Sequence, residues 1–224
     1  NDLDRDFARF YALETIARAP YFSYLSVLHL YETLGQWRHP DYLKIHFAES
    51  WNELHHLLIM EELGGNSKFA DRFVAQHVAF GYYWFNVVMY IANPVLAYAF
   101  MEHVEQHAYD TYDKFVDNHA DVLRERPAPA IARKYYCGGD LYMFDEFQTG
   151  ERRVTYVGPP GGEENMIDRI PNRERRRPRM DTLLDAFIAV RDDEGEHVKT
   201  LQTLQGIESE LCSSNSADDG CIIV

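Results

Sequence analysis

The chain has 224 residues, of which 46% are hydrophobic, and it carries a formal net charge of -14 at pH 7. A chain of this length with this share of apolar residues can bury one substantial core, so we expect a single domain with loose ends. The negative charge argues against nucleic acid as a partner, because proteins bind a phosphate backbone through clustered Lys and Arg.

Helical spacing of apolar residues dominates the sequence from residue 5 to residue 137, and no run alternates strictly as a half-buried strand does. The pattern predicts an all-α fold. The first helical region should end or kink near Ala19, because Pro20 cannot continue a helix. The expected helices are 6–37 with this break, about 40–63, about 67–92, about 94–119, shorter ones at 127–137 and 140–147, and a last long helix at about 180–206.

Two segments lack this periodicity. Residues 149–179 are rich in Gly, Pro and charge, which predicts an irregular excursion. From Glu208 the chain is polar, which is typical of a disordered tail. We therefore expect a helical domain over 1–207, interrupted by the excursion, and a disordered tail over 208–224.

No formally charged residue occurs in the 29 residues between Arg72 and Glu102, a length that could span a bilayer. However, Asn93 and Pro94 divide this stretch into two helices, and a spanning arrangement would place Glu102 and Glu105 deep in lipid. Burial inside a bundle is one alternative to spanning. The many Tyr, Trp and Phe side chains favour the other, a helix that lies in the membrane interface.

Two Glu-x-x-His pairs, Glu53 with His56 and Glu194 with His197, stand in long predicted helices. Residues three apart share one face of a helix, so each pair can present its carboxylate and imidazole together. Such pairs also occur by chance, and as ordinary ion pairs on a helix surface. Their apolar flanking residues favour burial instead.

Two further helices each offer a glutamate among apolar residues: Glu14 in FYALETIA, and Glu105 in FMEHVEQHAY, where Glu102 competes with it. A buried carboxylate requires a cation or hydrogen-bond donors. One glutamate from each of two helices plus Glu-x-x-His from two others is the ligand pattern of di-iron carboxylate bundles. Four carboxylates and two imidazoles suit iron or manganese better than zinc. The sequence thus predicts a ferritin-like four-helix bundle with additional membrane-facing helices.

Several of these residues have simpler interpretations. Glu14 on its own would be a solvated glutamate of an N-terminal helix. Asn52 and Asp193 immediately precede the two glutamates of the Glu-x-x-His pairs. They either orient the imidazoles that bind metal or face water.

The motifs that contain these residues resemble those of the alternative oxidases. They are LET at 13–15, NELHHL at 52–57, VEQHA at 104–108 and RDDEGEH at 191–197. Longer forms such as HFAESWNELHHLLIMEELGGN and KYYCGGDLYMFDEFQT are similar to the plastid terminal oxidase branch of the family. The resemblance covers about residues 5–148 and 180–205 and departs in the excursion and the tail.

The resemblance implies a non-haem di-iron quinol oxidase that takes electrons from plastoquinol and reduces O2 to water without moving charge across the membrane. It implies attachment to one leaflet of the chloroplast thylakoid membrane, or of a cyanobacterial thylakoid, and a homodimer. It favours Glu105 over Glu102. The implied ligands of the two iron ions are Glu14, Glu53, His56, Glu105, Glu194 and His197.

The resemblance also implies roles for residues near the metals. Tyr112 falls on a tyrosine close to the iron pair and is the implied catalytic residue. The positions that match the lining of the family's quinol pocket are Arg9, Leu13 and Thr111. Further motif positions of the plastid branch, expected to support the metal site from outside, are His29, Tyr90 and Asp193.

Two other functions remain compatible with the sequence. A soluble ferritin-like oxygenase or radical protein would share the metal ligands but would need neither membrane nor quinol. A metal-free helical scaffold on a membrane surface would contain no iron when folded and purified.

Overall fold

The computed structural model describes residues 2–138 and 178–215. The predicted helix at 140–147 and nearly all of the predicted excursion at 149–179 lie outside these residues. The elements are α1 (Asp2–Ala17), α2 (Ala19–Tyr31), the short 3-10 helix η1 (Glu32–Leu34), α3 (Pro40–Glu62), α4 (Phe69–Ala92), α5 (Pro94–Arg124), α6 (Ala130–Cys137) and α9 (Leu183–Asn215). Within the described ranges the only β-type pairing is an isolated bridge between Pro127 and Thr182, so the all-α prediction is confirmed.

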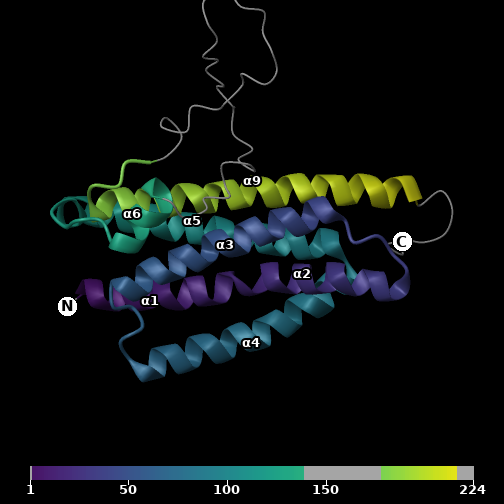
Figure 1. The fold of residues 1–224 in the computed structure, drawn as a ribbon, viewed down its shortest axis with the longest axis horizontal. Helices are drawn as coiled ribbons and strands as arrows, with labels where there is room; N and C mark the ends of the chain where they lie inside the picture. The colour runs from purple at the N-terminus through teal and green to yellow at the C-terminus, as the bar shows by residue number, and fades with distance from the viewer. Residues whose placement is uncertain (1, 139–177, 216–224) are drawn as a thin grey trace, which may run out of the picture.

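The helices form a four-helix bundle with one helix added to its side. Figure 1 shows α1 and α2 following one another along one line, with α3 beside them and with α5 and α9 forming the opposite pair. Among the described helices the contacts between α5 and α9 are the most extensive, and α3 packs against both α1 and α2. Helix α4 lies along the outer side of α1 and α2 (Figure 1).

Pro20 breaks the first helical region as its chemistry requires. Helix α1 ends at Ala17, α2 begins at Ala19, and Pro20 occupies the first turn of α2, where its missing N–H costs nothing. The chain continues in nearly the same direction (Figure 1). Side chains of both helices therefore line one side of the bundle interior.

The predicted disordered tail is wrong for residues 208–215, because α9 continues to Asn215. Glu208 is only 6% exposed, and it lies close enough to Tyr31 and Tyr42 to raise the pKa of both hydroxyl groups, after the larger effect of their own burial. Packing of Glu208 against α2 and α3 thus stabilises the helical conformation of a segment whose polar composition predicted disorder. Residues 216–224 lie outside the described part of the chain.

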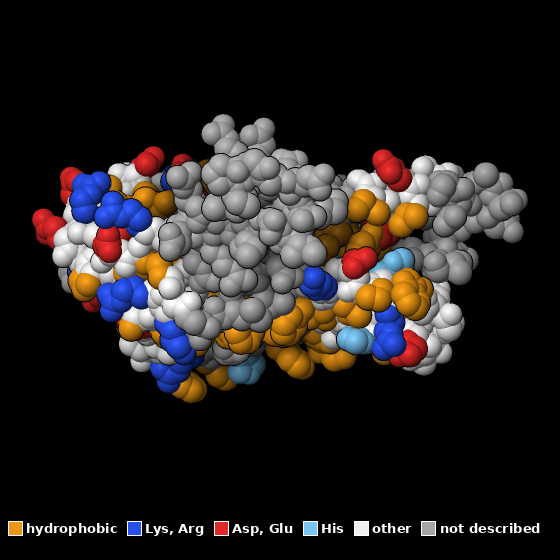
Figure 2. Space-filling model, turned by 45° about the horizontal axis from the view of Figure 1, so that its top comes forward, with side chains coloured by type: hydrophobic (Ala, Val, Ile, Leu, Met, Phe, Trp, Pro, Cys, Tyr) orange, Lys and Arg blue, Asp and Glu red, His pale blue; other side chains and the backbone are white. Residues whose placement is uncertain are grey.

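Helix α4 presents only a few side chains to the bundle and leaves the rest at the surface. Among the side chains it buries are Ala75, Asn86, Val87 and Tyr90. Its exposed apolar residues are Phe69, Phe73, Val74, Val78, Phe80, Trp84, Phe85, Val88 and Ile91. Figure 2 shows hydrophobic side chains gathered along the lower edge of the described surface. None of the described helices is long and apolar enough to cross a membrane.

Candidate metal centre

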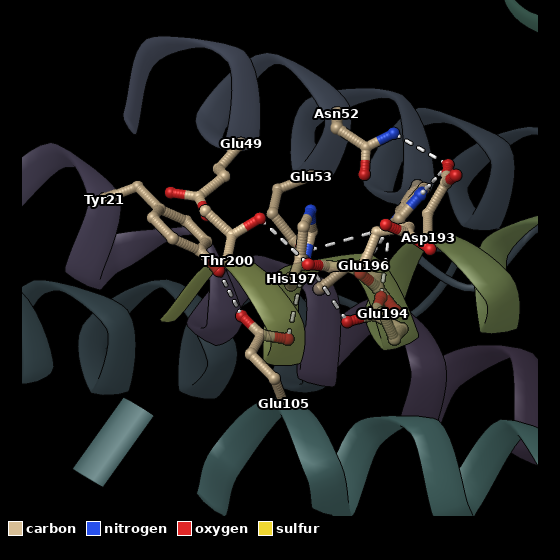
Figure 3. A network of polar contacts seen from close by, with 12 residues as sticks. Tyr21, Glu49, Asn52, Glu53, Glu105, Asp193, Glu194, Glu196, His197 and Thr200 are labelled. Carbon is tan, nitrogen blue, oxygen red and sulfur yellow. Dashed lines mark hydrogen bonds and ion pairs between the residues drawn. The ribbon is translucent and has the colours of Figure 1, made fainter. Parts of the chain in front are cut away.

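Six titratable side chains from four helices meet in the middle of the bundle, and each is 0% exposed. They are Glu14 from α1, Glu53 and His56 from α3, Glu105 from α5, and Glu194 and His197 from α9. Figure 3 shows Glu53, Glu105, Glu194 and His197, from α3, α5 and α9, turned toward one another. The two Glu-x-x-His pairs face each other because α3 and α9 lie on opposite sides of the bundle axis.

The six residues form two overlapping groups. Glu14, Glu53, His56 and Glu194 bring one ligand atom each within 4.8 Å of one another, and so do Glu53, Glu105, Glu194 and His197. Glu53 and Glu194 belong to both groups. Since a carboxylate has two oxygens, each of these shared residues can bridge two adjacent metal ions.

Both imidazoles turn Nδ1 toward the carboxylates. His56 Nδ1 lies 3.1 Å from Glu194 Oε1, 3.6 Å from Glu14 Oε2 and 3.8 Å from Glu53 Oε1. His197 Nδ1 lies 3.1 Å from Glu53 Oε1, 3.6 Å from Glu194 Oε2 and 3.7 Å from Glu105 Oε2. Each Nδ1 therefore lies 3.1–3.8 Å from the oxygens of three carboxylates. A metal ion placed among these atoms would have several ligands within reach.

Most of these carboxylate oxygens accept no hydrogen bond from the described residues. They are Glu14 Oε2, Glu105 Oε2 and both oxygens of Glu53 and of Glu194. A buried carboxylate without donors is costly, and a cation removes that cost. The donor set of oxygen with some imidazole nitrogen and no thiolate fits iron or manganese. The residues present therefore fit a pair of transition-metal ions.

Burial and crowding shift the pKa of three carboxylates of the cluster, Glu53, Glu105 and Glu194. Burial, then the charges of Glu194 and Glu14, raises the pKa of Glu53 well above its usual range. Burial, then the charge of Glu105, raises the pKa of Glu194 to about 7. Burial acts in the same direction on Glu105, but the favourable interaction with the His197 imidazole, whose Nδ1 lies 3.7 Å from Glu105 Oε2, outweighs this effect and lowers the pKa of Glu105. At neutral pH Glu53 and Glu194 therefore retain protons more readily than ordinary glutamates unless positive charge lies between them.

Asp193 holds His56 in place from outside the cluster. Asp193 Oδ2 accepts hydrogen bonds from His56 Nε2 at 3.2 Å, from Asn52 Nδ2 at 2.8 Å and from the Tyr136 hydroxyl at 2.8 Å. Donation from Nε2 leaves Nδ1 with its lone pair, directed at the carboxylate cluster. Of the two sequence interpretations of Asn52 and Asp193, burial against the imidazole is therefore the one that the geometry supports.

Tyr135 and Tyr136, on the short helix α6, are partners that the sequence analysis missed. The Tyr135 hydroxyl lies 2.8 Å from Asn52 Nδ2, and its ring stacks on His55 with centroids 3.9 Å apart. The adjacent pair of tyrosines carries no spacing relationship to the metal-binding motifs. No local signal pointed to them, because α6 reaches this position only through the packing of α6 on α3.

Two tyrosine hydroxyls donate to carboxylates at the ends of the cluster. Tyr112 donates to Glu14 Oε1, and Tyr21 donates to Glu105 Oε1 at 2.7 Å. Tyr112 was expected close to a metal pair, and its hydroxyl contacts Glu14 of the carboxylate cluster. Tyr21 was not predicted, because the break at Pro20 disrupts the helical spacing that would have related Tyr21 to Glu14.

A cavity of about 140 Å³ opens between α1 and α5, where Arg9, Leu13 and Thr111 lie together. Asp6, Phe10 and Phe115 complete its lining. The ring of Phe10 stacks on the ring of Tyr112 with centroids 4.3 Å apart. The three residues assigned to a quinol pocket thus lie on one cavity, separated from the carboxylate cluster by Tyr112.

Other predicted positions lie away from the cluster. His29 is exposed on α2, and Tyr90 is buried with its hydroxyl 2.7 Å from that of Tyr98. No contact found in the described structure joins either to the six residues. Glu102 turns outward and accepts a hydrogen bond from Gln202 at 2.9 Å, so Glu105 is the glutamate of α5 that faces the bundle centre.

Comparison with known proteins agrees with this site. The sequence profile of the alternative oxidase family matches residues 2–206. Ubiquinol oxidase 4, chloroplastic/chromoplastic, of Arabidopsis thaliana is 52% identical over 227 residues, covering 98% of this chain and 59% of the relative. Ubiquinol oxidase 2, mitochondrial, of Glycine max is 29% identical over 125 residues, covering 55% of this chain and 37% of the relative.

The chain thus spans about 59% of the length of the more similar of these two relatives. The search of solved structures found no significant match. The profile match extends over nearly every described helix and includes all six residues of the buried cluster. On this evidence the chain belongs to the alternative oxidase family.

Proposed function

We propose that this chain is a non-haem di-iron quinol oxidase that passes electrons from plastoquinol to O2 and forms water. The observation that carries the proposal is the pair of buried ligand groups that share Glu53 and Glu194. Both relatives are named ubiquinol oxidases, which supports a quinol as the substrate. The more similar relative is chloroplastic, which supports plastoquinol as that quinol. The reaction moves no net charge across a membrane.

Iron is the metal that this proposal assigns to the site. One ion would be held by Glu14 and His56, the other by Glu105 and His197. Glu53 and Glu194 would bridge them. When bound, an iron pair supplies the one-electron redox steps that O2 reduction needs and that no amino-acid side chain provides. The protein contributes the fixed carboxylates, which stabilise the higher oxidation state by charge.

Tyr112 is the proposed catalytic residue, because it stands between the substrate cavity and the cluster. Its hydroxyl donates to Glu14, and its ring packs on Phe10 of the cavity lining. Burial, together with the charge of Glu14, raises the pKa of Tyr112 well above its usual value. The hydroxyl therefore keeps its proton at neutral pH and can supply hydrogen to the site from a fixed position.

The cavity between α1 and α5 is the proposed quinol site. Leu13 gives it an apolar wall, and Arg9 gives it a cation that is held by Asp6 at 2.9 Å. The Thr111 hydroxyl already donates to the carbonyl of His107 at 2.7 Å, so its oxygen is the part left to accept a quinol hydroxyl. A ring bound here would lie next to Tyr112 and would release its protons on this side of the bundle.

The exposed apolar face of α4 is the proposed membrane-binding surface. Its exposed aromatic side chains include Phe80 at 68% and Trp84 at 54%, and aromatic residues of this kind favour the interface of a bilayer. Helix α4 packs along α1, which carries Arg9 and Leu13, so a quinol could reach the cavity sideways from lipid. We further propose a homodimer on one leaflet of the chloroplast thylakoid membrane.

Oxygen uptake with a short-tailed plastoquinol, measured together with iron content, tests the proposal. Glu53→Ala removes a bridging carboxylate and should abolish bound iron and lower uptake by about a hundredfold or more. Glu61→Ala, a matched control two turns further along α3, should change neither. Folded wild-type protein without iron would favour the metal-free scaffold. Bound iron without quinol-dependent uptake would favour a soluble ferritin-like oxygenase.

A further inference from the structure

A second buried polar network lies beside the carboxylate cluster, and nothing in the proposed reaction has used it. The Tyr90 hydroxyl is 2.7 Å from the Tyr98 hydroxyl, Tyr98 is 2.9 Å from His46 Nε2, and His46 Nδ1 is 3.0 Å from Glu49 Oε2. None of the four side chains is more than 2% exposed. They come from α3, α4 and α5, so the network exists only in the folded bundle.

The donors and acceptors of this network have one consistent direction. Glu49 as a carboxylate can only accept, so His46 donates from Nδ1 and presents the lone pair of Nε2. Tyr98 must then donate to His46, and since a hydroxyl has one proton, Tyr90 donates to Tyr98. Every hydrogen bond points from Tyr90 toward Glu49, which is the arrangement that proton transfer along a chain requires.

The inner end of the network reaches the metal centre. Glu49 lies one helical turn before Glu53 on α3, and its Oε1 accepts no hydrogen bond from the described residues. Figure 3 shows the Glu49 carboxyl beside Tyr21, whose hydroxyl donates to Glu105 Oε1. The charge of Glu49 contributes to the raised pKa of Tyr21, after burial and Glu105, which is consistent with this proximity.

The outer end reaches the rim of the bundle. Tyr31, Tyr42 and Glu208 all act electrostatically on Tyr90, and each of the three retains a small exposed fraction of 6–9%. Glu208 is 11 residues beyond His197 on α9, which corresponds to about 16 Å at 1.5 Å per residue. Tyr90, Tyr31 and Tyr42 belong to one core cluster, so the outer end of the network lies among side chains that retain some exposure to water.

Close packing of this core does not require the polar groups of the network. The surrounding core cluster contains apolar residues such as Val27, Leu28 and Met101, and a Phe at position 98 would fill the same space without a polar atom. Buried polar networks are costly unless every member is satisfied, and Glu49 Oε1 is not. A carboxylate oxygen with no described donor, directed away from its own imidazole partner, is what a terminal proton acceptor would present.

We propose that Tyr90, Tyr98, His46 and Glu49 form a proton relay from the rim of the bundle to the metal centre. The inference rests on the proposed oxidase function, in which two quinols supply four electrons and O2 takes up four protons to form two waters. The relay moves protons only. For each O2 the relay takes up four protons at the rim, and the two quinols release four through the cavity near Arg9, so the overall reaction consumes no net protons.

Each transfer breaks one bond and forms one. The Tyr98 O–H bond breaks as its proton bonds to His46 Nε2, while the Nδ1 proton of His46 passes to Glu49. Tyr98 recovers a proton from Tyr90, which recovers one at the rim. Glu49 then gives its proton to the oxygen of the O2 substrate that becomes water, and reversal of the His46 tautomer restores the starting arrangement.

Tyr98→Phe is the decisive variant, because it removes one hydroxyl from the relay and keeps the ring. Tyr24→Phe is its matched control: Tyr24 is also 0% exposed in the same cluster, but its hydroxyl donates to the Ala97 carbonyl at 3.2 Å and takes no part in the relay. In iron-loaded protein we expect kcat to fall about tenfold or more in Tyr98→Phe, with unchanged iron content and quinol KM. Tyr24→Phe should stay within about twofold of the wild type.

A second readout needs neither metal nor quinol. Exchange of the His46 Nδ1 proton with solvent, followed by NMR in the metal-free protein, should slow about fivefold or more in Tyr98→Phe and not in Tyr24→Phe. Backbone amide exchange of α3 should be equal in both, which reports intact packing. Unchanged imidazole exchange overturns the relay even if kcat falls, because the effect would then be structural. Unchanged kcat in an active enzyme overturns it as well.

This design separates the relay from the oxidase proposal. If the wild type takes up no oxygen with quinol, the oxidase function fails, and the metal-free exchange measurement still decides whether a proton path reaches His46. If the wild type is active and the two Tyr→Phe variants behave alike in both measurements, only the relay fails.

Discussion

The centre of the bundle and the outer face of α4 reverse the usual distribution of side chains in opposite ways: charge is buried in one and apolar surface is exposed in the other. The centre holds four fully buried glutamates, where most proteins place aliphatic side chains. The outer face of α4 exposes Phe, Trp, Val and Ile, with Phe69 at 70%, where most proteins place charge. The two regions lie close in the fold, because α4 packs on α1 and α2, and α1 carries Glu14 of the cluster (Figure 1).

In both regions the side chains of this protein leave an unfavourable free energy that a binding partner could remove. Buried carboxylates without donors need cations, and a contiguous exposed apolar face needs another apolar phase. A metal pair in the centre and a lipid surface along α4 would satisfy both needs. Because the proposed quinol cavity lies between them, the same arrangement would bring a lipid-soluble reductant to a charged site.

The largest effect should come from removing a carboxylate of the centre. We expect Glu105→Ala to lose most of its bound iron and to reduce quinol-dependent oxygen uptake by about a hundredfold or more. Glu102→Ala, on the same helix but turned outward toward Gln202, should bind iron and turn over normally. Equal behaviour of the two variants, in metal analysis and oxygen-electrode assays, would contradict the inward position of Glu105.

Tyr112→Phe should separate metal binding from turnover. The variant keeps the ring that stacks on Phe10 but loses the proton donated to Glu14. We expect iron content to remain at the wild-type level while kcat falls about a hundredfold, as is typical when a positioned proton donor is lost. Tyr109→Phe on the same helix is the control, and full activity in Tyr112→Phe would remove the assigned role.

A charge on the outer face of α4 tests the other region. Trp84→Lys should weaken binding to liposomes of thylakoid lipid composition by about tenfold, because one aromatic anchor is worth roughly 1.5 kcal/mol. Leu211→Lys makes the same kind of change on α9, at a residue 44% exposed. It should leave binding unchanged in a flotation assay. Equal loss in both variants would mean that the α4 face has no special role.

The stability of the metal-free protein should also depend on pH. Glu194 has a pKa of about 7 in the folded chain against 4.5 for an ordinary glutamate. Between these values the folded state binds more protons than the unfolded state, so the free energy of unfolding should fall as pH rises from about 4.5 to about 7.

Chemical denaturation at several pH values measures this fall. We expect Glu194→Gln to reduce this fall in the free energy of unfolding by about 2 kcal/mol. The value is smaller than the raised pKa of Glu194 alone would give, because neighbouring groups titrate together with Glu194. Wild type and variant with the same pH dependence would contradict the raised pKa.

The sequence located most of this architecture because the relevant patterns are local. Pro20 and the Asn93–Pro94 pair mark helix boundaries that the structure has, because a proline ring excludes a helical hydrogen bond wherever it stands. The helix ends were less well predicted. The polar composition after Ile207 suggested a disordered tail, yet the burial of Glu208 against distant helices keeps that segment helical.

The residues themselves determined that Glu53 and His56 share a helix face, as do Glu194 and His197, since a spacing of three is a property of any α-helix. Helical spacing left Glu102 and Glu105 as alternatives; the resemblance favoured Glu105, and the tertiary structure buries it at the bundle centre. Only the tertiary structure brought Tyr21 to Glu105 and Tyr136 to Asp193. It also joined Tyr90 to His46 through Tyr98. Those choices depend on how each helix is rotated and placed against the others, and that depends on the packing of the whole bundle, which no short stretch of sequence contains.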